Sequence, residues 1–455
     1  MEPRLTTVDS KTLYKNMAKV ALPISVQGLI TSSLTLIDNL MVGSLGESEL
    51  SAVGVAGNVF FVFFLLIWGF CAGCSTFLAQ FFGAGDMKNI RKTMGFMWLV
   101  CGIIAALFFL LTYGMPHAVL RFFTDIQVMI DLGAAYMRIA AFSTLFLVLI
   151  IPCNTALRSI QKPHIPLVTG IVSFATNTVL NYILIFGKFG APRMGVEGAA
   201  LATCIARALE AVIVAFLIFG GRVPVSGKLR EFLGWPKELV RRVLRNALPV
   251  TLNESLWGLG VTMYAAAFAR VGVTAYASVQ ASLAINDLFQ TAAMGVGDAS
   301  LILLGQKLGE NNLEEARGYA KKFLRAGLAV GIAVGLLLIV LGRPIVGFFD
   351  FTAEGAMYTR YILLIFGVMM PVSLLNMIIV TGILRSGGDT RFALIVDAGS
   401  VWVLGIPAAF VSALVFHWPI YLCVAAIQFE ALVKLVVLWI RYRQEKWVRN
   451  VISGL

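Results

Sequence analysis

Hydrophobic residues fill long stretches of the chain, and short polar segments separate these stretches at regular intervals. Each stretch reaches the roughly 20 apolar residues that an α-helix needs to cross a bilayer. A transmembrane β-barrel would instead alternate apolar and polar residues. The pattern predicts an all-α polytopic membrane protein with twelve transmembrane helices, at about 14–39, 50–80, 93–115, 131–157, 165–187, 196–220, 240–269, 276–306, 318–341, 356–384, 392–415 and 419–440.

The composition supports this class and excludes others. Of the 455 residues, 59% are hydrophobic and only 13% are charged, whereas a soluble domain is about a quarter charged. A soluble enzyme of this length could not remove so much apolar surface from water, and disordered chains are polar.

The net charge of +12 would suggest a nucleic-acid partner in a soluble protein. With the N-terminus in the cytoplasm, 27 of the 36 Lys and Arg residues fall on the cytoplasmic side and 5 on the outer side. This is the distribution that the positive-inside rule predicts. We therefore expect a multi-pass protein of the cell membrane, with both termini cytoplasmic and no nucleic-acid partner.

The two halves of the chain repeat each other. At an offset of 226 residues Ala21-Leu22-Pro23 matches Ala247-Leu248-Pro249, Gln80 matches Gln306, and Gly83 matches Gly309; Leu157-Arg158-Ser159 matches Leu384-Arg385-Ser386 at 227. An offset of six helices gives parallel repeats, related by a pseudo-twofold axis along the membrane normal. We expect an N-lobe at 1–220, a cytoplasmic linker at 221–239 and a C-lobe at 240–455.

Repeated halves suit alternating access, in which two bundles move around a shared cavity. The chain contains no H-E-x-x-H, P-loop or G-x-S-x-G motif, so neither metalloprotease chemistry nor ATP hydrolysis is supported. The six cysteines lie in apolar spans, where a disulfide framework is not expected. We predict a transporter driven by an ion gradient, not an enzyme, with no organic cofactor.

Several motifs resemble the multidrug and toxic compound extrusion (MATE) family across nearly the whole chain. They are 37–43 (IDNLMVG), 50–54 (LSAVG), 80–85 (QFFGAG), 156–158 (ALR), 177–182 (NTVLNY), 198–203 (GAALAT) and 382–390 (GILRSGGDT). The resemblance implies twelve helices in two lobes, and export of organic cations and other drugs in exchange for H⁺ or Na⁺. It also implies contact with membrane lipid, and we expect a monomer.

Asp38 is the leading candidate among the few charged residues within the spans. A membrane carboxylate is costly unless it faces water or a partner, and removal from water favours its protonated form. Asn177 and Asn181 are four residues apart, hence on one helical face. With Thr203, these oxygens could bind a proton or Na⁺; the alternatives are a capping role for Asp38 and interhelical hydrogen bonding for the asparagines.

The resemblance places Asp38, Asn177, Asn181 and Thr203 in the family's N-lobe cation site. One prokaryotic branch of the family has Asp where this chain has Asn181. Asp38 is then the one acid assigned to the site, and the choice between H⁺ and Na⁺ stays open.

The second half differs, because Tyr264 occupies the repeat position of Asp38. Candidate substrate or cavity residues are Glu254, Asp287, Asn286, Gln280 and Asn154. For Glu254 and Asp287, buried polar pairing is an equal alternative.

Other charged residues within the spans are expected to form ion pairs. Asp298 and Asp397 are expected to pair with Arg385 or Arg391, and the spacings of Arg207–Glu210 and Glu430–Lys434 predict local pairs.

The function predicted here is secondary antiport of cationic or amphipathic drugs. An alternative is a lipid-linked oligosaccharide flippase of the same superfamily, which would need a cationic cavity. A membrane-embedded enzyme or a channel is disfavoured by the missing motifs and the duplication.

Overall fold

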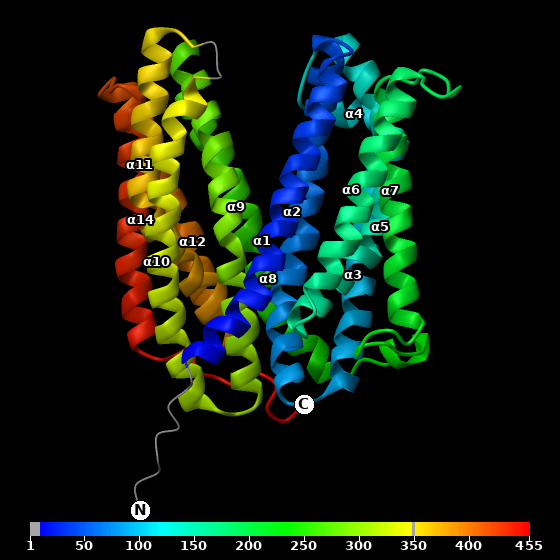
Figure 1. Ribbon diagram of the computed structural model, residues 1–455, viewed down its shortest axis with the longest axis vertical. Helices are drawn as coiled ribbons and strands as arrows, with labels where there is room; N and C mark the ends of the chain where they lie inside the picture. Colours follow the sequence, from blue (N-terminus) through cyan, green and yellow to red (C-terminus); the bar gives the residue numbers. More distant parts are fainter. Residues whose placement is uncertain (1–9, 348–350) are drawn as a thin grey trace, which may run out of the picture. The chain divides into compact units, whose positions relative to one another are not determined.

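The computed structural model describes residues 10–347 and 351–455. Within these residues the chain forms helices and no β-strand. The elements are α1 (Ser10–Gly43), α2 (Glu47–Gly83), α3 (Met87–Gly114), α4 (Pro116–Arg121), α5 (Gln127–Ser159), α6 (His164–Phe186), α7 (Val196–Phe219), η1 (Leu229–Phe232), α8 (Lys237–Phe268), α9 (Val273–Gly309), α10 (Leu313–Val346), α11 (Ala353–Met377), η2 (Ile378–Leu384), α12 (Thr390–Ser400), η3 (Val401–Gly405), α13 (Ile406–Phe410), η4 (Val411–Val415) and α14 (Ile420–Arg443) (Figure 1).

Each predicted span corresponds to one of these helices or to a continuous run of them. Eleven helices in the described part of the chain are long and apolar enough to cross a membrane. The remaining predicted span, 240–269, corresponds to α8, whose first turns carry several charged side chains. The short helix α4 and the 3₁₀ turn η1 were not predicted from hydropathy, because neither is long enough to produce a span signal.

The helices divide into two compact units. The first unit contains Val26–Leu78 and Asp86–Leu244, and the second contains the described residues 10–25, 79–85, 245–347 and 351–455. The chain passes from one unit to the other within α1 and α8, close to the repeat-related prolines Pro23 and Pro249. Proline removes a helix hydrogen bond and bends the helix. The predicted lobe limits stay a prediction.

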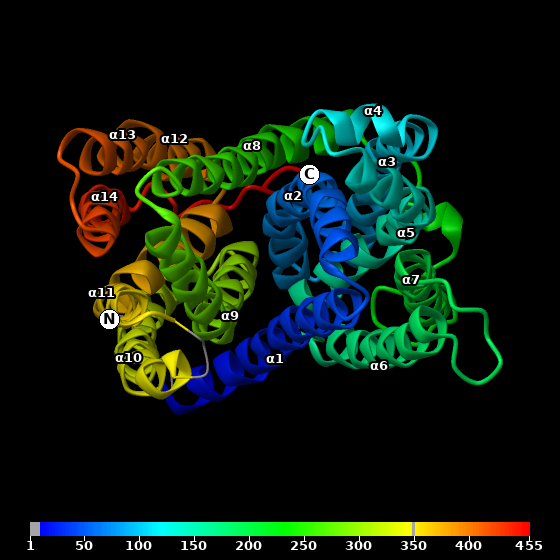
Figure 2. The ribbon, with the colours of Figure 1, turned by 90° about the horizontal axis from the view of Figure 1, so that it is seen from above.

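In the first unit α5 packs between α3 and α7, and α7 also packs along α6 (Figure 2). The small helix α4 lies across one end, where Leu120 is fully buried with Ala56, Val59 and Met137. This packing fixes α6 and α7, which carry most of the predicted cation site, against the rest of the unit.

In the second unit α11 contacts α10, α9 and α14 (Figure 2). The tenth and eleventh predicted spans are not uniform α-helices, since η2, η3 and η4 are π-helical. At η2 a close contact constrains the backbone, because a Cβ on Gly382 would overlap the Ser300 side chain. π-Helical turns inside α-helices often occur at functional sites.

The internal repeat is visible in how α2 meets α9 within the second unit. A Cβ on Gly83 would overlap the backbone carbonyl of Gln306, and a Cβ on Gly309 would overlap that of Gln80. Sequence comparison pairs these residues with each other, so the contact is reciprocal. Glycine is needed at both positions because the two backbones touch.

A second contact recurs inside each unit separately. In the first unit Arg158 Nη2 donates to Gln27 Oε1 at 2.7 Å, and in the second unit Arg385 Nη2 donates to Glu254 Oε1 at 2.6 Å. Each pair is separated by 131 residues, and the arginines are repeat partners. The two halves therefore repeat their internal contacts as well as their helices.

Candidate functional site

The predicted cation site lies in the first unit, where α1, α6 and α7 meet. Asn181 Nδ2 donates to Asp38 Oδ1 at 2.5 Å and to Asn177 Oδ1 at 3.0 Å. Asn177 Nδ2 in turn donates to Thr203 Oγ1 at 3.0 Å. The structure thus brings all four predicted residues into one chain of hydrogen bonds.

Helix geometry explains the arrangement. Asn177 and Asn181 are one turn apart on α6, so their side chains stack on one face and contact each other. Both asparagines are almost fully buried, whereas Asp38 and Thr203 are partly exposed. The amides therefore form the inner wall, and the carboxylate and hydroxyl face the more open side.

One buried oxygen among these four hydrogen-bonded side chains has no hydrogen-bond donor. Asn181 Oδ1 is buried and has no partner among the described residues, while the same side chain uses its nitrogen twice. A buried acceptor without a partner costs free energy, about 1–3 kcal/mol. An acceptor oxygen beside a carboxylate is suited to receive a proton donor or a cation.

Apolar residues close the site one helical turn away. Val42 is four residues after Asp38, Ile185 is four after Asn181, and Ala199 is four before Thr203. These three residues are buried in one hydrophobic cluster, with Tyr136 packed against it. The polar side chains are therefore shielded from water on this side. Hydropathy gave no signal for this closure or for Tyr136, since both depend on tertiary packing.

The carboxylates of the second half have different surroundings. Glu254 accepts from Arg385, whose side chain is only 5% exposed. Asp397 contacts Lys434 at 3.1 Å and accepts from Asn253 Nδ2 at 2.8 Å. The ion pair of Asp397 is therefore with Lys434 and not, as predicted, with Arg385 or Arg391, because the partner on α14 is close only in the folded unit. The charge of Arg385 also acts on Asp397, although more weakly than that of Lys434.

Two local ion pairs predicted from spacing are confirmed. Arg207 contacts Glu210 at 2.9 Å, and Lys434 contacts Glu430 at 3.2 Å. Glu430 also accepts from Ser400 at 2.6 Å. Lys434 therefore joins two carboxylates in a buried network that sequence spacing alone could not show.

No observed contact among the described residues brings the remaining candidate cavity residues together at one site. Gln280 bonds Tyr276 at 2.5 Å and Asn286 bonds Gln290 at 3.3 Å, both within α9. Asp287 is exposed at mid-helix and has no ion pair within the described ranges. Asn154 belongs to the first unit, where its Oδ1 is buried without a partner.

No cluster of three or more His, Cys, Asp or Glu residues suited to a metal ion occurs within residues 10–347 and 351–455. The predicted Na⁺ ligands at Asp38, Asn177 and Asn181 are of a different kind, since they combine one carboxylate with neutral amide oxygens. All six cysteines are free thiols, and five of them are buried.

Repeated helical bundles of membrane-spanning length, with a carboxylate–amide site held inside one of them, define a polytopic membrane transporter. Two copies of the MatE family model match the chain, at residues 23–183 and 250–411. The chain belongs to the MatE family, and the prediction of a transporter rather than an enzyme is confirmed.

Curated relatives cover most of the chain. The "Probable multidrug resistance protein NorM" of Thermotoga maritima is 25% identical over 408 residues, which cover 89% of this chain and 87% of the relative. The "Probable multidrug resistance protein YoeA" of Bacillus subtilis is 25% identical over 422 residues, which cover 90% and 89%.

Solved structures confirm the predicted fold class. An outward-facing conformation of a multidrug resistance MATE family transporter has a TM-score of 0.87 at 19% identity, covering 97% of this chain and 99% of the other. MATE in the straight conformation gives the same TM-score, identity and coverage. At this identity the likeness concerns the fold, a twelve-helix, two-lobe membrane protein.

Proposed function

We propose that this protein is a secondary antiporter that exports cationic or amphipathic drugs in exchange for H⁺ or Na⁺, acting as a monomer. The relatives are named as multidrug resistance proteins, which supports the substrate class. The observation that carries the coupling site is the Asp38 carboxylate bonded to Asn181 within the first unit.

The site suggests how a coupling ion would be sensed. The Asp38 carboxylate accepts from Asn181 Nδ2, whereas Asn181 Oδ1 has no partner. A proton on Asp38 would turn this acceptor into a donor, and the asparagine oxygen is the neighbouring group able to receive it. A Na⁺ ion would instead collect the Asp38 and Asn181 oxygens, with Thr203 Oγ1 nearby as a further ligand.

Either event changes hydrogen bonds that join α1 to α6 and α6 to α7. Coupling requires that ion and drug prefer different conformations, and a difference of a few kcal/mol is sufficient. The ion would therefore act by shifting the packing of three helices in the first unit.

Gradient-driven efflux tests this proposal. Purified protein in proteoliposomes should export ethidium when a pH gradient or a Na⁺ gradient is imposed alone, and the gradient that works identifies the ion. Asp38→Asn should abolish gradient-driven efflux. Asp131→Asn is a matched control, since its carboxylate is 59% exposed and lies outside the site.

Undiminished gradient-driven efflux by Asp38→Asn would refute the assigned site. No efflux of any cationic dye by the wild type under either gradient would refute the antiport function itself. Two basic residues within the spans, Arg207 and Lys434, are held in ion pairs with acids and are therefore not available for the anionic headgroup that the flippase alternative requires.

We also propose that both termini are cytoplasmic. The basic residues around η1 then lie inside, and the α6–α7 loop at 187–195 lies outside. A membrane-impermeant maleimide should label a cysteine introduced at Gly190 in intact cells, and one at Gly234 after lysis alone. The reverse labelling pattern would invert the topology.

A further inference from the structure

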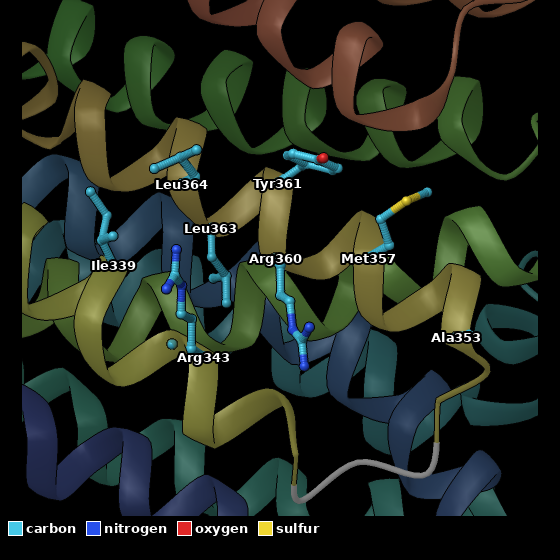
Figure 3. A pocket seen from close by; sticks show the side chains of 9 residues that line it. Ile339, Arg343, Ala353, Met357, Arg360, Tyr361, Leu363 and Leu364 are labelled. Atoms are coloured by element: carbon cyan, nitrogen blue, oxygen red, sulfur yellow. The ribbon is translucent and has the colours of Figure 1, made fainter.

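A hollow of about 490 Å³ opens between α10 and α11 of the second unit. It is distant in sequence from the proposed cation site. Its lining joins two kinds of side chain: the basic Arg343 and Arg360, and an apolar and aromatic set of Ile339, Met357, Tyr361, Leu363 and Leu364. Figure 3 shows the side chains of Arg343 and Arg360, which come from the two helices that line the hollow.

Close helix packing forms the floor of this hollow. A Cβ on Gly335 would overlap the carbonyl of Gly367, so the helices touch there. Further along, a Cβ on Gly342 would lie 3.0 Å from Leu363 Cδ1. Glycine leaves room at this level, and the hollow opens where the two arginines project.

Both arginines are exposed, and neither guanidinium has a hydrogen bond or ion pair within residues 10–347 and 351–455. Among residues 10–347 and 351–455, no acidic side chain lines the hollow. The nearby Glu354 accepts from Tyr358 at 2.6 Å and is not part of the lining. The hollow therefore presents two positive charges, and it is suited to an anion.

Both arginines lie near helix ends, where membrane-spanning helices reach the lipid headgroups. Helix α10 has 34 residues, about 51 Å at 1.5 Å per residue, and is therefore longer than the roughly 30 Å hydrocarbon core. Arg343 lies three residues before Val346, about 5 Å from the end, and Arg360 lies seven residues after Ala353, about 10 Å from the start of α11.

An apolar surface continues from the hollow toward the middle of both helices. Leu336, Val340, Leu364 and Val368 are 58%, 67%, 43% and 61% exposed. In a membrane these side chains contact acyl chains. A ligand with an anionic group at the arginines and hydrocarbon along these residues would match the whole surface.

We propose that this groove is a binding site for an anionic glycerophospholipid. The phosphodiester would receive charge-assisted hydrogen bonds from Arg343 and Arg360, which arginine makes in a paired, planar geometry. The acyl chains would lie along Leu364 and Val340. Free phosphate satisfies the arginines alone, whereas the apolar rim favours a lipid.

Native mass spectrometry of the full chain in detergent tests this site. With phosphatidylglycerol and phosphatidylcholine added separately, the wild type should retain the anionic lipid more tightly. Each arginine near an anionic lipid should contribute about fivefold in affinity, so Arg343→Gln/Arg360→Gln should lose about thirtyfold. Arg121→Gln, at an exposed arginine of α4 in the other unit, should lose nothing.

Two further measurements distinguish a lost lipid site from misfolding and from binding of phosphate alone. Arg343→Lys/Arg360→Lys keeps the charge and should retain part of the preference, which distinguishes a lost site from a misfolded variant. Inorganic phosphate should not displace the lipid at concentrations that leave the protein folded. Equal retention of both lipids by the wild type, an equal loss in Arg121→Gln, or displacement by phosphate would each overturn the proposal.

Discussion

The reciprocal glycine contact between α2 and α9 makes a sharp stability prediction. Alanine at Gly83 would place its Cβ against the backbone of Gln306, and alanine at Gly309 would place its Cβ against that of Gln80. The obstructing atoms belong to the backbone and not to a flexible side chain, so the helices themselves must separate. Such overpacking typically costs about 1–3 kcal/mol.

Part of this cost is offset, because alanine is favoured over glycine in a helix by up to about 1 kcal/mol. The offset is small here, since Gly83 and Gly309 are the last residues of their helices. We expect each variant to lose about 1–3 kcal/mol, or about 2–12 °C in the melting temperature of a unit of this size.

The assay is thermal unfolding of purified protein in detergent. Gly57→Ala is the matched control, because Gly57 lies within α2 and nothing approaches its Cβ position within 4 Å. That variant should be neutral or slightly more stable than the wild type. The double variant should lose less than the sum of the single losses, since one separation of the helices relieves both overlaps.

Melting temperatures of Gly83→Ala and Gly309→Ala equal to that of Gly57→Ala would refute this reasoning. A large loss in one variant alone would show that the contact is not reciprocal in energy, although it is reciprocal in geometry.

Two other predictions concern buried polar groups. Lys434→Met should destabilise the second unit by about 3–5 kcal/mol, because it leaves two buried carboxylates without their cation. As a control in the same denaturation assay, Glu445→Gln breaks an exposed ion pair with Arg317 and should cost less than about 1 kcal/mol. In native protein a thiol reagent should label Cys204 at most, and denaturation should expose all six cysteines. Labelling of Cys71 before unfolding would contradict the burial of its side chain.

The membrane spans could be predicted from the sequence, because each helix needs about 20 apolar residues of its own to cross the bilayer. The same periodicity placed Asn177 and Asn181 on one face. Hydropathy could not show that α1 brings Asp38 against Asn181, although the family resemblance indicated it. The π-helical segments were not predictable either, since hydropathy does not distinguish a π-helical turn from an α-helical one.

The partner of Asp397 shows the limit most clearly. Sequence reasoning chose arginines that lie close along the chain, but the ion pair forms with Lys434, 37 residues away on α14. Spacing identifies partners within a helix, as it did for Glu430 and Lys434. Partners on different helices depend on the rotation of each helix about its own axis, which a few charged residues in an apolar span do not fix.

The two halves share a scaffold and differ in their polar chemistry. Equivalent arginines bond to the first helix of each half, but Arg158 contacts the neutral Gln27 whereas Arg385 contacts the acidic Glu254. Asp38 contacts an amide and is partly exposed, while its repeat position holds Tyr264. In the second half the carboxylates of Glu254, Asp397 and Glu430 are each bonded to a cationic side chain. A carboxylate that already has a fixed cation is a poor site for a second one, so among these acids the arrangement favours Asp38 as the place where a mobile cation would bind.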